Sequence, residues 1–201
     1  MEIDGMTEQI SLSEAKRHDR LRDWAHGLSN GELMLDGVKT SSRVGFISRL
    51  KLALAIRFLE QAIDIHSEDW SAMWSLGKIY QRLQNDAKSL SYFSRAADIV
   101  PEHPDVSREA GVAALNLGDG PKAEFYCQAA CRNAPENSGL ISNLACAYLI
   151  NGHVERALST AQEAIARNPD DHITKTVLRV IIEVTEGKRP RPNSLRNISP
   201  I

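Results

Sequence analysis

Apolar residues between positions 70 and 169 recur with the spacing of helices, in blocks that each hold two helical faces. In the first block, the residues at positions i, i+3, i+4 and i+7, which share one face of a helix, are Met73, Leu76, Gly77 and Tyr80. A second face in the same block is formed by Ser89, Phe93 and Ala96. We therefore expect two helices in each block, packed closely where small residues meet and filled by larger neighbours.

The blocks repeat every 34 residues, because the prolines that close them are Pro101, Pro135 and Pro169. When the three blocks are aligned on these prolines, six further columns of the alignment hold residues of similar type. Their members are Leu76/Ala110/Leu144, Gly77/Gly111/Ala145, Tyr80/Ala114/Tyr148, Ser89/Ala123/Ala157, Phe93/Cys127/Ala161 and Ala96/Ala130/Ala164. Proline ends the second helix because it lacks an N–H group and restrains the preceding residue. Gly118 and Gly152 fall between the two helices of their blocks, where a left-handed cap residue suits glycine. An accidental spacing in a generic helical bundle would not give this agreement.

This pattern resembles the tetratricopeptide repeat, whose helix pairs recur every 34 residues. The resemblance implies an all-α, right-handed α-solenoid made of one eroded repeat, three good repeats and a C-terminal capping helix, preceded by an N-terminal helix. The expected boundaries are 1–31 for the N-terminal segment, 32–187 for the solenoid and 188–201 for an extended tail. The repeats and the capping helix are expected at about 34–67, 68–101, 102–135, 136–169 and 170–187.

The N-terminal part of the pattern is weaker. Residues 11–28 predict a helix that Ser11 or Ser13 caps and Ser29–Gly31 ends, with Trp24 packing on the first repeat. A second helix is clear from about Ser48 to His66. The residues before it have low helix propensity, so we expect either a short helix from about Leu35 or one continuous bent helix.

The C-terminal part predicts one more helix, from Asp170 to Glu186, which begins at an Asp pair suited to capping. Prolines 190 and 192 exclude helix and strand from the following residues, so 188–192 should be extended and mobile. Residues 193–201 are expected to be disordered.

Composition narrows the class of protein. A chain of 201 residues with 42% hydrophobic content can bury a sizeable core, and a net charge of −2 gives no bulk signal for nucleic-acid binding. No apolar run is long enough to span a membrane, the N-terminus lacks a secretory apolar segment, and three cysteines form no disulfide framework. We expect a cytoplasmic protein that binds neither nucleic acid nor membrane.

The resemblance also implies that the first helix of each pair lines the inside of a curved array. The side chains expected to face a peptide-binding groove there are Trp74, Lys78, Arg82, Arg108, Val112, Leu115, Ser142, Asn143, Cys146 and Leu149. This lining begins charged and aromatic and ends apolar, which favours a peptide that is apolar at one end and acidic at the other. The alternative is that the tail or the N-terminal helix covers this surface, or that Val112 and Leu115 pack between repeats.

Catalytic and metal sites have little support in the sequence. Cys127 and Cys131 are spaced i, i+4 and could hold a metal on one helical face, but both align with apolar positions of other repeats. No nucleophile elbow, phosphate loop or carboxylate pair is present. We expect no enzymatic activity, no cofactor and no metal.

Two functions follow as hypotheses. The first is a non-catalytic scaffold or adaptor that binds a peptide segment of a partner protein in the groove. The second is a small cytoplasmic secretion-type chaperone, because type III chaperones have a similar size and about three such repeats, and hold hydrophobic client segments. A homodimer through the weak N-terminal region, where Trp24 and Phe46 lie, is a further possibility.

Overall fold

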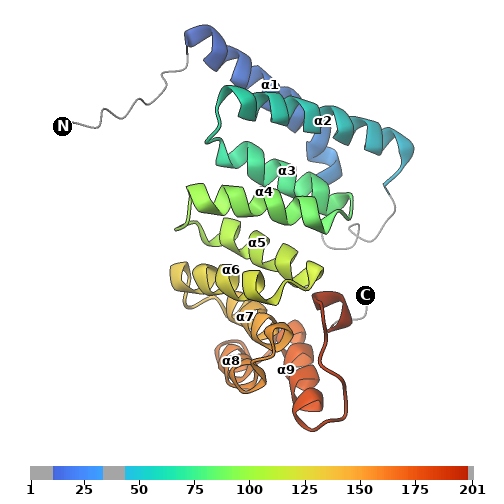
Figure 1. Cartoon of the computed structure of the whole chain (residues 1–201), viewed down its shortest axis with the longest axis vertical. Coiled ribbons are helices and arrows are strands. Elements are labelled where there is room, and N and C mark those ends of the chain that lie inside the picture. The colour runs from blue at the N-terminus through green and yellow to red at the C-terminus, as the bar shows by residue number, and fades with distance from the viewer. Residues whose placement is uncertain (1–10, 34–43, 199–201) are drawn as a thin grey trace, which may run out of the picture. The chain divides into compact units, whose positions relative to one another are not determined.

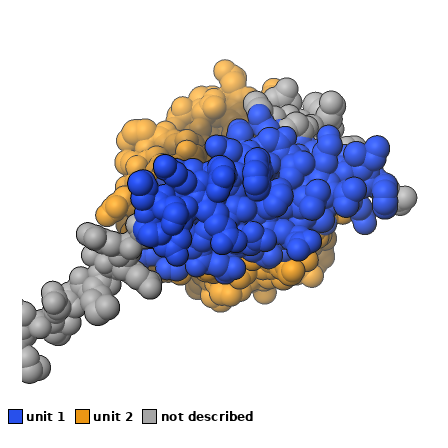
Figure 2. Space-filling model, turned by 90° about the horizontal axis from the view of Figure 1, so that it is seen from above, with its two compact units in different colours: residues 1–83 blue, residues 84–201 orange. Residues whose placement is uncertain are grey.

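A computed structural model describes residues 11–33 and 44–198 (Figure 1). These residues form nine α-helices and one short 3₁₀ helix, with no strand among them. The chain divides into two compact units, residues 1–83 and 84–201, which Figure 2 colours separately. Within the described ranges, no helix has both the length and the apolar character needed to cross a membrane.

The first unit contains α1 (Leu12–Leu33), α2 (Phe46–Ile65) and α3 (Trp70–Arg82). Helix α1 packs on α2, and both contact α3. Ser11 and Glu14 begin α1 with a capping box, since the Ser11 amide donates to Glu14 and the Glu14 amide donates to the Ser11 hydroxyl. The core side chains of α1 and α2 in this unit are Leu21, Ala25, Leu52, Ala55, Leu59 and Ala62.

The pairing of α1 with α2 differs from the expected arrangement of the first repeat. Helix α1 does not end at Ser29–Gly31 but continues to Leu33, and it supplies the first helix of the pair. The short helix expected from about Leu35 lies outside the described residues, and α2 begins at Phe46. Trp24 does pack on α2, with its ring centroid 5.5 Å from that of Phe58.

The second unit contains α4 (Asp86–Ile99), α5 (Pro104–Leu117), α6 (Gly120–Asn133), α7 (Ser138–Asn151), α8 (Val154–Arg167), α9 (His172–Thr185) and the 3₁₀ helix η1 (Leu195–Asn197). Each α-helix packs on the next in sequence. Helix α7 also contacts α5 and α9, so the first helices of successive repeats form a layer of their own. The six repeat columns are buried throughout, except that Leu144 is partly exposed.

The helix ends follow the predicted chemistry. Gly118 and Gly152 end α5 and α7 with φ angles of 80° and 94°, the left-handed region that favours glycine. Asn85, Asp119, Asn137 and Asp171 cap α4, α6, α7 and α9, each accepting hydrogen bonds from backbone amides with its side chain.

The tail departs from the expectation of a mobile, disordered end. Residues 188–198, which we call the tail, have an irregular backbone with bends at 188–189 and 193–194 before η1, and they pack on the helices of the second unit. Figure 1 shows this segment returning from the end of α9 to lie beside the other helices. Pro192 is buried and Ile198 is only 1% exposed, so burial of apolar groups holds the tail in place. Residues 199–201, also expected to be disordered, lie outside the described residues.

Candidate protein-binding surfaces

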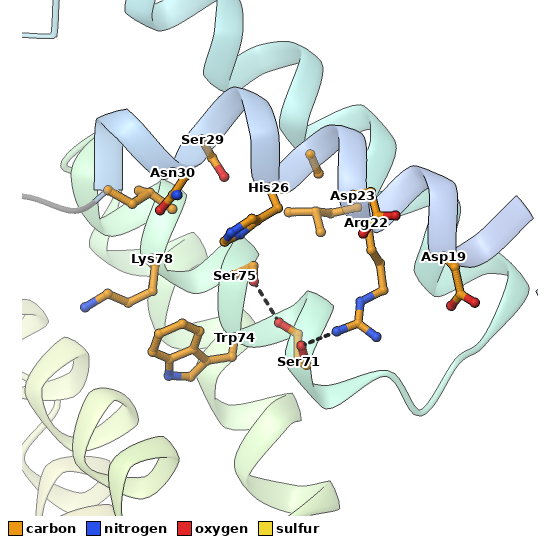
Figure 3. A pocket seen from close by; sticks show the side chains of 13 residues that line it. Asp19, Arg22, Asp23, His26, Ser29, Asn30, Ser71, Trp74, Ser75 and Lys78 are labelled. Atoms are coloured by element: carbon orange, nitrogen blue, oxygen red, sulfur yellow. Dashed lines mark hydrogen bonds between the residues drawn. The ribbon is translucent and has the colours of Figure 1, made fainter. Parts of the chain in front are cut away.

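An open cavity of about 650 Å³ lies in the first unit, between α1 and α3. Figure 3 shows side chains of α1, among them Arg22, His26 and Asn30, on one side and those of α3, among them Trp74 and Lys78, on the other. The volume falls in the range of pockets that bind small ligands or several side chains of a peptide.

Asp69 fixes the geometry of this cavity because it connects α1 with the start of α3. Its Oδ1 atom accepts a hydrogen bond from the Ala72 amide, at 2.9 Å, and so caps α3. Its Oδ2 atom lies 2.9 Å from Nε2 of His18 and 3.4 Å from Nε of Arg22. Arg22 then reaches α3 directly, since its Nη2 atom donates to the Ser71 hydroxyl at 2.8 Å (Figure 3).

Trp74 and Lys78 lie one turn apart on α3, and both line the cavity. The Nζ atom of Lys78 is 5.7 Å from the centroid of the Trp74 ring, a cation–π distance. Both side chains are partly exposed. Arg82, one turn further on, is partly exposed but does not line the cavity.

Charges of both signs line the cavity. Asp19 and Asp23 bring carboxylates from α1, whereas Arg22 and Lys78 bring positive charges from α1 and α3. A ligand that stacks an apolar group on the indole could therefore also form ion pairs at the rim of the cavity. No single-sign field selects a strongly acidic or strongly basic ligand.

The other seven predicted groove residues lie in the second unit, and four of them are not surface residues. Leu115 and Leu149 are 0% exposed, Cys146 is 1% exposed and Ser142 is 3% exposed. The packing of their helices accounts for this burial, because α5 contacts α4, α6 and α7, and α7 contacts α5, α6, α8 and α9. The apolar end of the predicted groove is therefore part of the protein interior.

Three residues of the second unit remain partly exposed as predicted: Arg108, Val112 and Asn143. Arg108 already has partners on its own helix, with Nη1 2.8 Å from the Asp105 carboxylate and Nη2 3.1 Å from Glu109. These ion pairs hold the guanidinium of Arg108 against its own helix.

The burial of α7 had a signal in the sequence. Residues 144–150 are apolar without interruption, and a helix that is apolar on all sides is typical of a protein interior. The cavity residues of α1, such as Arg22 and His26, had no such signal, because α1 was not expected to belong to a repeat.

The three cysteines lie in the second unit and are poorly suited to react. Burial raises the pKa of Cys127 well above its ordinary value, and raises the pKa of Cys146 to about 12. Burial also raises the pKa of the partly exposed Cys131 to about 11. Within the described part of the chain, no cluster of three His, Cys, Asp or Glu side chains could hold a metal ion.

Exposed apolar side chains gather on the first two helices. Trp24 is 55% exposed, and Phe46, Ile47 and Leu50 at the start of α2 are 83%, 70% and 56% exposed. A homodimer contact through this surface stays a prediction.

The chain was compared with known proteins. A tetratricopeptide-repeat family model matches residues 47–104 and 96–138. No curated protein sequence matches significantly.

Solved structures share the fold at low sequence identity. The chain is similar to residues 41 to the end of MamA from Desulfovibrio magneticus RS-1, with 15% identity, a TM-score of 0.68, and coverage of 89% of this chain and 88% of that one. Another MamA crystal structure is 12% identical, with a TM-score of 0.70 and coverage of 86% and 84%. The Cut9–Hcn1 hetero-tetramer of the APC/C gives 16% identity, a TM-score of 0.56, and coverage of 66% of this chain and 27% of that one.

The helix pairs, the 34-residue period and the left-handed caps agree with both comparisons. Tetratricopeptide repeats build a helical solenoid, an architecture that presents binding surfaces to other proteins. Residues 47–138 therefore belong to the tetratricopeptide-repeat family, and the chain has the all-α solenoid fold of that family.

Proposed function

We propose that this protein is a non-catalytic adaptor that binds a peptide segment of a partner protein in the cavity between α1 and α3. The observation that carries the proposal is the placement of Trp74 and Lys78 side by side on an open cavity of about 650 Å³. Trp and Arg are the residues that most often dominate binding energy at interfaces, and this cavity contains both in Trp74 and Arg22.

The chemistry of the cavity indicates the kind of segment that would fit. A large apolar side chain would stack on the Trp74 indole, and a carboxylate next to it would pair with Lys78. The partner is therefore a segment with an apolar residue followed or preceded by an acidic one. The carboxylates of Asp19 and Asp23 would disfavour a second acidic residue at their end of the cavity.

The burial of Leu115, Cys146 and Leu149 supports an adaptor over a chaperone. The chaperone hypothesis places the client in an apolar groove, and these residues would have formed the apolar end of that groove.

Capture from native cell extract, followed by identification of the partner and mapping of its bound segment, tests the proposal. Trp74→Ala and Lys78→Glu should each weaken binding of the mapped segment by at least about tenfold, the effect of losing about 1.4 kcal/mol. Trp24→Ala is the matched control, because Trp24 is exposed but packs on Phe58 away from the cavity. Equal binding by all variants would refute the proposed site. A large drop in the melting temperature of Trp74→Ala would show that Trp74 stabilises the fold instead.

A further inference from the structure

The tail follows a defined path over the second unit. Its Arg191 side chain donates through Nη1 to the carbonyl oxygen of Ile150, in the last turn of α7. Further along, the backbone of Asn193 lies against Gly118, the residue that ends α5, and η1 contacts α5. Arg196 then reaches the first turn of α4, where its Nη2 atom is 2.5 Å from the Asp86 carboxylate. The surface under the tail, which we call the tail site, thus comprises the C-terminal ends of α5 and α7 and the start of α4.

The tail site holds its occupant through charge and backbone contacts as well as through buried apolar groups. The last carbonyl groups of a helix have no partners within the helix and carry a partial negative charge, which suits the guanidinium of Arg191. The Asp86 side chain is only 14% exposed, so its pairing with Arg196 is better shielded from water than a surface ion pair.

Glycine gives the tail room to approach. A Cβ atom at Gly118 would lie 2.4 Å from the carbonyl oxygen of Asn193, and one at Gly152 would lie 3.3 Å from Nη1 of Arg191. Any other residue at Gly118 would overlap the tail backbone. The same two positions end helices of successive repeats, so the tail crosses equivalent points of the array.

The tail is held in the manner of a bound peptide rather than of a core element. Its backbone is irregular apart from η1, and only Pro192 and Ile198 are buried, while Arg191 and Arg196 stay more exposed. Few buried apolar groups imply a low free energy of local opening. A tethered segment can still occupy such a site, because the tether gives it a high effective concentration.

We propose that the tail site is a peptide-binding site that the chain's own tail occupies in competition with a segment of another protein. The competing segment is basic and follows the path of the tail, with one arginine placed for the Ile150 carbonyl, a second for Asp86, and an aliphatic residue for the position of Ile198. Its chemistry differs from that expected at the cavity between α1 and α3, and the proposal does not depend on that cavity.

The test measures binding of a fluorescent peptide with the sequence of residues 188–201 to the full-length protein. Two variants release the tail in different ways: Ile198→Asp removes the buried aliphatic anchor, and Arg196→Glu places a negative charge beside Asp86. Lys188→Ala is the matched control, because Lys188 is 69% exposed and pairs only locally with Glu186. Circular dichroism verifies folding, and hydrogen exchange of the Asn197 and Ile198 amides, which donate to the carbonyl groups of Ser194 and Leu195, reports whether the tail is docked.

Both release variants should bind the peptide at least about tenfold more tightly than the wild type and Lys188→Ala, if at most about a tenth of wild-type molecules are open. A peptide in which Arg196 is replaced by Glu should not bind. The Trp74→Ala substitution should leave peptide binding unchanged, which separates this site from the cavity in the first unit.

Three results would overturn the proposal. If the released variants bind the peptide no better than the wild type, the tail is a fixed part of the fold and not the occupant of a peptide-binding site. Rapid exchange of the hydrogen-bonded Asn197 and Ile198 amides in the wild type would show that the tail does not dock. Dimers of the wild type that exchange tails, detected by light scattering, would assign the site to a second copy of the chain.

Discussion

The Asp69 carboxylate lies 2.9 Å from the His18 imidazole, 51 residues away in sequence, while it also caps α3. One side chain therefore joins α1 to α3. Asp69 is only 5% exposed, and His18 is 8% exposed. This contact determines where α1 lies against α3, and therefore the shape of the cavity between them.

Replacing Asp69 by Ala should lower the free energy of unfolding by about 2 kcal/mol or more, since loss of an N-cap costs about 1 kcal/mol and an unpaired buried partner costs about 1–3 kcal/mol. Asp69→Asn keeps a capping oxygen and should cost less than Asp69→Ala. Urea denaturation measures both values. Equal losses for the two variants would show that the cap contributes little.

Gly111 and Gly27 offer a matched pair of helical glycines. A Cβ atom at Gly111 would lie 2.7 Å from Sγ of Cys127 on α6, whereas one at Gly27 would meet nothing within 4 Å. Gly111→Leu should therefore destabilise the protein by about 1–3 kcal/mol or more through overpacking. Gly27→Leu should be neutral or stabilising, because glycine costs a helix about 0.5–1 kcal/mol. A neutral Gly111→Leu variant would contradict the close approach of α5 and α6.

The cysteines should react slowly and in a defined order. At pH 8, a thiol with a pKa of about 11 has roughly a hundredfold less thiolate than one with a pKa near 9, and only the thiolate reacts with iodoacetamide. Mass spectrometry should show Cys131 alkylated first, because it alone is partly exposed, and Cys127 and Cys146 only after unfolding in urea. Modification of Cys146 as fast as Cys131 would mean that α7 is not enclosed.

The same thiols make stability depend on pH in the alkaline range. Their pKa values are raised in the folded state, so the neutral thiol is favoured by folding. Their contribution to the free energy of unfolding is complete below the pKa of the unfolded thiol. It is lost as pH rises from about 9 towards the pKa values of the folded state.

Gln84 follows α3 at the position that corresponds to Gly118 and Gly152, and its φ angle of 58° is left-handed. Side chains other than glycine pay about 1–2 kcal/mol in this region, so Gln84→Gly should stabilise the protein by up to about 1 kcal/mol. Gln84→Ala keeps the strain and should change stability little. Thermal melting of the two variants and the wild type distinguishes backbone strain from any effect of the glutamine side chain.

Gly118→Ala should release the tail as well as strain the end of α5. Gly187 also has a positive φ angle, of 70°, but nothing lies within 4 Å of its Cβ position, so Gly187→Ala is the control for strain alone. We expect the hydrogen-bonded amides of Asn197 and Ile198 to exchange about tenfold faster in Gly118→Ala than in Gly187→Ala, an effect of about 1.4 kcal/mol. Equal exchange would place the tail backbone farther from Gly118.

The periodic part of the sequence predicted its structure well because packing and helix ends leave direct marks on residue type. Phe93, Cys127 and Ala161 fill one column, and all three are buried in the structure. Gly118 and Gly152 were identified as helix ends from their spacing alone, and both have the expected φ angles.

The first repeat and the tail were harder to predict, because long-range contacts determine them. Nothing near Leu33 in sequence indicates that α1 pairs with α2, and the interaction of His18 with Asp69 becomes visible only in three dimensions. The tail appeared to be a solvated basic segment, because the acceptors of Arg191 and Arg196 lie 41 and 110 residues away. The predicted exposure of Leu115 and Leu149 on the inner surface was wrong for the same reason, since the residue pattern of one helix does not show which other segments cover that helix.

Gly118 and Gly152 each have two roles, one in a repeat and one beside the tail. Each glycine serves a helix end that any duplicated repeat would inherit, and each also leaves clearance for a segment that is not repeated. Selection would therefore act against a substitution at either site for two reasons: it would disturb a helix end, and it would hinder access to the surface beneath residues 188–198. Such double constraint should make these two positions slower to diverge than Gly27, which faces open solvent.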